Sequence, residues 1–160
     1  MRMRILPLLL VVGLFAGCGG GDDDSDSSSA KAQPLVGTTW ELQEITGTAG
    51  KVTKPASGEP PTLTFRPGKK VAIFTGCNSG SGSAVIQGPD QGAEVEFGRI
   101  ALTLKACLDP TTAKVEDLMV KAFAQMDVIE VPKDGSGMTL ATSGPVEKGG
   151  TPLEFRFQSQ

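Results

Sequence analysis

The sequence predicts an α+β fold, a mostly antiparallel β-sheet that is barrel-like or two-layered and carries one amphipathic helix at about residues 110–126. Two observations predict the sheet. Apolar and polar residues alternate in short runs, which places one face of each strand in the core and the other in water. The 160 residues also include 21 glycines and 11 prolines, a content typical of many turns. One segment changes to a helical period.

Strand patterns recur along the chain after residue 34, and their alternation is typical of antiparallel strands. The run from Val71 to Phe74 is apolar at every position, which predicts the most central strand. The Gly/Ser-rich run Asn78–Ser83 predicts a hairpin loop that leads into a strand at Ala84–Ile86. The apolar positions of the other predicted strands are Trp40 and Leu42; Leu63 and Phe65; Val95 and Phe97; Ile100, Leu102 and Leu104; Met138 and Leu140; and Leu153, Phe155 and Phe157.

The helix is predicted by apolar residues at i, i+3, i+4, i+7, i+8 and i+11, which form one stripe that covers the sheet. Asp109 is placed to accept hydrogen bonds from the first turn, and Pro110 suits the first helical position, where no amide donor is needed. The stripe consists of Val115, Leu118, Met119, Ala122, Phe123 and Met126.

The first 17 residues have the three-part plan of an export signal. Two arginines precede an apolar run, Ile5–Phe15, and the small residues Ala16 and Gly17 follow it. The run is shorter than the roughly 17 residues that a membrane-spanning helix needs. We therefore expect residues 1–17 to be a signal peptide.

Phe15-Ala16-Gly17-Cys18 resembles the lipobox of bacterial lipoproteins, although Phe15 stands where that family usually has Leu, Val or Ile. The resemblance implies that Cys18 is lipidated and becomes the first mature residue. It also implies a lipid-anchored location at the cell membrane, facing the extracytoplasmic side. An ordinary secretion signal is the alternative.

Residues 18–33 contain the anchor cysteine and a Gly/Asp/Ser tether without large apolar side chains, so we expect a flexible spacer. The acids at 22–26 lack the glycine and the glutamate of a calcium loop. Removing the signal takes Arg2 and Arg4 from the 15 basic residues and leaves all 18 acidic ones. This acidity disfavours nucleic acid as a partner. The remaining residues, 34–160, are expected to form one domain.

The order of motifs in residues 34–160 resembles the META domain of HslJ-like proteins. The resemblance starts at the run 37–42 and is most specific in Gly-Cys-Asn and Thr-x-x-Ala-Cys, followed by the predicted helix. The chain departs from the family at 82–84, where Gly-Ser-Ala stands for a frequent Gly-x-Tyr, and at Lys105, which replaces a frequent Met. The matching motif residues are Gly76, Cys77, Asn78, Thr103, Ala106 and Cys107.

The resemblance implies a compact β-rich domain with one helix, found in exported and envelope proteins. The family is associated with heat stress, drug tolerance and virulence rather than with a known reaction. It supplies no catalytic residues.

Cys77 and Cys107 are the thiols that remain once Cys18 is lipidated. Outside the cytoplasm disulfides persist, so pairing is the favoured interpretation. Two buried free thiols are the alternative. A zinc site is disfavoured because it would need further ligands. A redox role is disfavoured because the two residues are not arranged as Cys-x-x-Cys. We expect no metal and no cofactor.

The chain has no His and no Tyr, which excludes imidazole acid–base chemistry and a tyrosyl nucleophile. Asn78 is interpreted as a turn residue rather than a functional amide. The run 78–83 lacks the Gly-Lys-Ser/Thr ending of a phosphate loop. Glu94 and Glu96 share one strand face, where a solvated face is favoured over a glycosidase pair.

These observations predict a non-enzymatic envelope lipoprotein with no catalytic residues. It would bind or shield an unknown envelope protein or ligand, and the META resemblance implies a role in envelope or heat stress and in drug tolerance. The membrane would be its partner through Cys18. The alternative is a small-ligand binder, or an inhibitor of a lytic or proteolytic enzyme that uses a loop at 46–61 or 80–92.

Overall fold

The computed structural model describes residues 34–47, 51–56, 58–144 and 152–160. The predicted signal peptide at 1–17, the lipidation site Cys18 and the tether up to residue 33 lie outside the described residues. In the described part of the chain, no helix has both the length and the apolar character needed to cross a membrane.

The described residues form ten strands and one helix, α1, which spans Pro110–Ala122. The strands are β1 Thr39–Thr46, β2 Val52–Thr53, β3 Thr62–Arg66, β4 Lys70–Phe74, β5 Ser79–Gln87, β6 Gln91–Phe97, β7 Ala101–Leu102, β8 Val128–Glu130, β9 Met138–Ala141 and β10 Glu154–Ser159.

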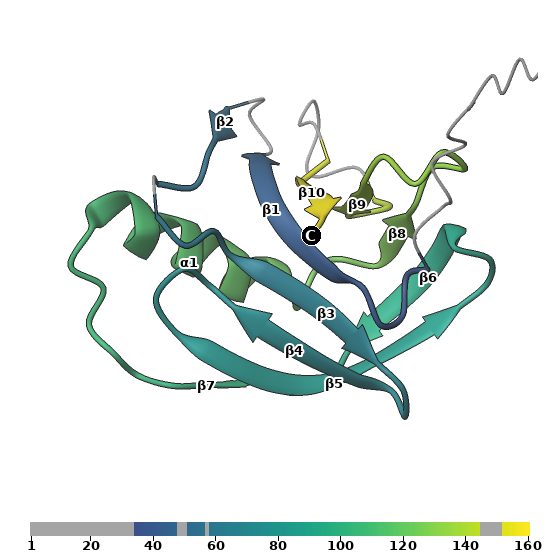
Figure 1. Ribbon diagram of the computed structural model, residues 1–160, viewed down its shortest axis with the longest axis horizontal. Coiled ribbons are helices and arrows are strands. Elements are labelled where there is room, and N and C mark those ends of the chain that lie inside the picture. The colour runs from purple at the N-terminus through teal and green to yellow at the C-terminus, as the bar shows by residue number, and fades with distance from the viewer. Residues whose placement is uncertain (1–33, 48–50, 57, 145–151) are drawn as a thin grey trace, which may run out of the picture.

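The strands close into an antiparallel barrel (Figure 1). The order is β10-β9-β8-β6-β5-β4-β3-β1, and β1 then pairs with β10 from Trp40↔Ser159 to Thr46↔Glu154. β2 pairs with the end of β1, and β7 pairs with β5. The barrel-like prediction is confirmed. β4, which the sequence predicts to be the most central strand, lies between β3 and β5. Because the barrel is closed, none of its strands is central.

Alternation along the strands fills the barrel as the sequence predicts. In β1, Trp40, Leu42 and Ile45 are buried. In β3, Leu63 and Phe65 are buried and alternate with two half-exposed threonines and the exposed Arg66. The indole Nε1 of Trp40 donates a hydrogen bond of 3.2 Å to a backbone carbonyl, so the buried ring leaves no polar atom without a partner.

Helix α1 starts where the sequence predicts and ends four residues before the predicted 126. Val115, Met119 and Ala122 are buried against the core. The backbone amides of Gln125 and Met126 both donate to the Ala122 carbonyl, so the chain turns away there.

Asp109 caps the start of α1 by accepting a 2.7 Å hydrogen bond from the Thr112 amide. Hydrogen bonds from the Thr112 backbone and then its hydroxyl lower the pKa of the Asp109 carboxyl below its usual value. The contribution of this cap to stability is therefore present above the unfolded pKa and is lost as pH falls through the lower folded pKa.

The hairpin loop predicted at 78–83 is wrong, because Ser79–Gln87 is one nine-residue strand. A Cβ built on Gly80 would lie 2.3 Å from the Ala101 carbonyl oxygen, and one on Gly82 would lie 2.7 Å from that of Arg99. The glycines thus mark a place where another backbone segment crosses the strand closely. The crossing segment contains β7, which ends at Leu102 and not at Leu104 as the sequence predicts.

Replacing Gly80 with alanine should lower the free energy of unfolding by about 1–3 kcal/mol, because the methyl group collides with backbone that cannot easily move. Urea denaturation measures the loss. Gly144→Ala is the matched control, since a Cβ there meets nothing within 4 Å. Equal stability of the two variants would contradict the close crossing.

Candidate functional site

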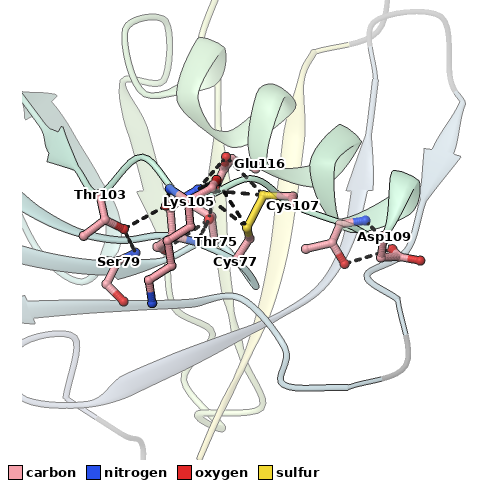
Figure 2. Close-up of a disulfide and its surroundings, with 10 residues drawn as sticks. Thr75, Cys77, Ser79, Thr103, Lys105, Cys107, Asp109 and Glu116 are labelled. Atoms are coloured by element: carbon pink, nitrogen blue, oxygen red, sulfur yellow. Dashed lines mark hydrogen bonds between the residues drawn. A yellow bond between two sulfur atoms is a disulfide. The ribbon is translucent and has the colours of Figure 1, made fainter.

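The connection between β7 and α1 is fastened to the connection between β4 and β5 by a disulfide (Figure 2). Cys77 and Cys107 have their Cα atoms 5.7 Å apart and are bonded through sulfur, so the favoured pairing is confirmed. We call residues 103–108 the clamped loop. Every residue in it except Cys107 is exposed.

The side chain of Asn78, which is only 2% exposed, binds the backbone of the clamped loop as the backbone of a neighbouring strand would. Its Oδ1 accepts a 2.7 Å hydrogen bond from the Lys105 amide, and its Nδ2 donates a 3.1 Å bond to the Lys105 carbonyl. A primary amide has the donor and acceptor of a peptide group, so it can pair with both backbone groups of one residue.

Glu116 extends the network from the clamped loop to α1. Asn78 Nδ2 lies 3.0 Å and 2.9 Å from the two carboxylate oxygens of Glu116, and the Thr75 hydroxyl donates to the same carboxylate. The Thr75 hydroxyl also accepts a 2.9 Å bond from the Asn78 amide. Buried side-chain nitrogen and oxygen atoms in the described part of the chain all have partners, so the network is complete.

Thr103 closes the network on the side of β5. Its hydroxyl donates a 2.8 Å hydrogen bond to Asn78 Oδ1 and accepts a 3.1 Å hydrogen bond from the Ser79 amide. The Thr103 amide donates a 2.9 Å hydrogen bond to the Ser79 carbonyl. Figure 2 shows Thr103, Lys105 and Cys107 lined up beside the β4–β5 connection.

Gly76 and Ala106 complete the motif residues. Gly76 has φ +89°, a left-handed conformation that glycine tolerates, and a Cβ there would lie 3.2 Å from Thr112 Cγ2. The left-handed residue of this turn is therefore Gly76, whereas Asn78 bonds to residues far along the chain. Ala106 is exposed, and nothing in the structure explains it.

The sulfurs of Cys77 and Cys107 and the Glu116 carboxylate lie within 4.8 Å of one another, as a three-ligand metal site would. The sulfurs are bonded to each other, so they offer no thiolate to a metal. Sequence reasoning missed Glu116 and Thr75, since neither the helix period nor the cysteine spacing marks a polar residue as a network partner.

The clamped loop exposes two leucines. Leu104 is 99% and Leu108 is 95% exposed, although both side chains are large and apolar. Sequence reasoning placed Leu104 on a half-buried strand face and did not consider Leu108.

Other residues weighed as candidates lie apart from this site. Glu94 and Glu96 are exposed on β6, as a solvated strand face would place them. The proposed inhibitor loop at 80–92 is instead made of β5, a turn and the start of β6. The loop at 46–61 includes β2 and is only partly described.

Comparison with protein families identifies this architecture. The model of the META domain matches residues 33–158, which include the clamped loop and all of the barrel except Ser159, the last residue of β10. The chain belongs to the META domain family. In this META domain, the two cysteine-containing motifs are the two sides of one clamp.

The META barrel is similar to an NMR structure of a protein from Burkholderia xenovorans, with 20% identity, coverage of 94% of this chain and 99% of that one, and a TM-score of 0.63. A second NMR structure is 18% identical and covers 74% of this chain and 87% of that one, with a TM-score of 0.49. No curated protein matches the sequence. The first likeness supports the fold.

Proposed function

We propose that this chain is a membrane-anchored envelope lipoprotein, an HslJ-like META protein, that protects the cell by binding a partner rather than by catalysis. Its role would lie in heat or envelope stress and in drug tolerance. The observation that carries the proposal is the clamped loop, which holds Leu104 and Leu108 almost wholly in solvent.

Ordering an exposed loop costs about 1–2 kcal/mol per residue in backbone entropy. The disulfide and the hydrogen bonds from Asn78 offset that entropy cost, although the clamped loop adds little to the barrel core. A preorganised loop loses little further entropy on association, so its apolar side chains contribute more of their burial to affinity. Rigidity and apolar exposure together favour a contact surface.

The clamped loop lies far from the point where the described chain begins. The described chain starts beside the β5–β6 turn, where the Leu35 amide lies 3.5 Å from Asp90 Oδ2. The clamped loop joins the other end of β5 at Ser79. A nine-residue strand is about 30 Å long. The connection from β7 to α1, which contains the clamped loop, therefore lies at the opposite end of the domain from the first described residues (Figure 1).

The anchor is tested by mass spectrometry of the membrane fraction. The mature chain should begin at Cys18 and carry added acyl mass, and Cys18→Ala should release the protein or stall its processing. Recovery of an unmodified soluble chain that begins elsewhere would refute the lipoprotein assignment.

The binding role is tested by complementing a deletion strain under heat and envelope-targeting antibiotics. The chain with Leu104→Ser and Leu108→Ser should fail to protect. Val52→Ser, an exposed apolar residue outside the clamped loop, should protect fully, and so should Glu94→Gln with Glu96→Gln. Protection by the double leucine variant, or its loss in the glutamate variant, would contradict the proposal.

A further inference from the structure

An apolar groove of about 190 Å³ lies next to the clamped loop, between α1 and the segment that leads into β7. Ile100 and Leu102 line one side, and Val120 and Phe123 line the other. Val120 is 46% exposed, so the groove opens to solvent. A cavity of about 150 Å³ with a similar apolar lining accepts benzene, so this groove is large enough for one leucine side chain.

The groove and the exposed Leu104 lie close together on the molecule. Leu102 lines the groove, and Leu104 follows two residues later with its side chain free in solvent. A two-fold dimer requires each copy to carry both halves of the contact on one surface. This surface carries an apolar projection and an apolar recess, which meets that requirement.

We infer that the partner of the clamped loop is a second copy of this chain, in which Leu104 of each copy enters the groove beside Val120 of the other. The inference rests on the proposed binding role and names its partner. A second copy supplies an apolar projection, Leu104, for the apolar groove beside Val120. Copies anchored to one membrane would also meet at high effective concentration.

The test uses full-length chains with two different affinity tags, co-produced in the native membrane and solubilised in mild detergent. Leu104→Lys in both copies should lower recovery of the second tag about tenfold or more, and so should Val120→Asp in both. When one copy carries Leu104→Lys and the other Val120→Asp, recovery should return, because the lysine then meets an aspartate and the other half of the contact is unchanged.

The matched control is Val52→Lys in both copies, which should not change recovery, since Val52 is 49% exposed and lies outside the groove. All variants should keep the circular dichroism spectrum of the folded parent, because the replaced side chains are exposed. No recovery in the mixed pair, or no loss in the single variants, would overturn the two-fold contact.

A photo-crosslinker at position 104 separates this inference from the proposed function. Crosslinks to the groove of a second copy support both. Crosslinks to a different protein, without co-recovery of the two tags, overturn the second-copy inference and leave the binding role intact. Crosslinks to lipid, or none at all, overturn both.

Discussion

Asn78→Asp should lower the free energy of unfolding by about 3–5 kcal/mol. The change removes the Nδ2 donor that serves the Lys105 carbonyl and the Glu116 carboxylate, and it places a negative charge beside that carboxylate in a site that is 2% exposed. Chemical denaturation at neutral pH measures the loss.

The matched control is Gln91→Glu, which makes the same change of amide to acid at an exposed position of β6. Because Gln91 lies opposite Glu130 in the sheet, the added charge should lower stability by no more than about 1 kcal/mol. If Asn78→Asp were as mild as Gln91→Glu, the Asn78 network would not hold the clamped loop.

Loss of the Cys77–Cys107 disulfide should lower the free energy of unfolding by about 3–4 kcal/mol, because it closes a loop with a sequence separation of 30. In a domain of this size the unfolding temperature should fall by about 10 °C. Thermal unfolding with and without a thiol reductant measures the change.

The chain with Cys77→Ala and Cys107→Ala is the control, since reductant should have no effect on it. In the unreduced parent, alkylation should find no free thiol at Cys77 or Cys107. Quantitative alkylation of both, or an unfolding temperature that reductant does not change, would contradict the disulfide.

The barrel is the part of this structure that the sequence predicts well, because burial of one strand face leaves a period of two. Trp40 with Leu42, and Leu63 with Phe65, are buried as expected. Barrel closure is a different matter. The pairing of β1 with β10 joins the two ends of the domain, and no local pattern records it.

Gly80 and Gly82 show why a local rule fails. A Gly/Ser-rich run is typical of a loop, and here it is the strand over which residues 99–102 cross. Glycine is needed at these two positions because a segment about 20 residues away in the sequence lies against them. Only the tertiary structure shows this contact. β8, at Val128–Glu130, has three residues and was not predicted, since so short a run gives no measurable alternation.

The candidate site was predictable in its covalent part and not in its polar part. Cysteine count and compartment indicate the disulfide, which is confirmed. The polar partners of Asn78 are a backbone 27 residues away and a helix carboxylate 38 residues away. Exposure of Leu104 and Leu108 follows from this network, so a strand pattern could not predict it.

Hydrogen exchange at the Lys105 amide tests most directly whether Asn78 clamps the loop. This amide lies in an exposed segment and donates 2.7 Å to Asn78 Oδ1. We predict slow exchange at Lys105, close to that of Ile73 in β4, and fast exchange at Ala106, whose amide has no acceptor among the described residues. Asn78→Ala should make Lys105 exchange as fast as Ala106 while Ile73 stays protected. Equally fast exchange at Lys105 and Ala106 in the parent protein would contradict the clamp.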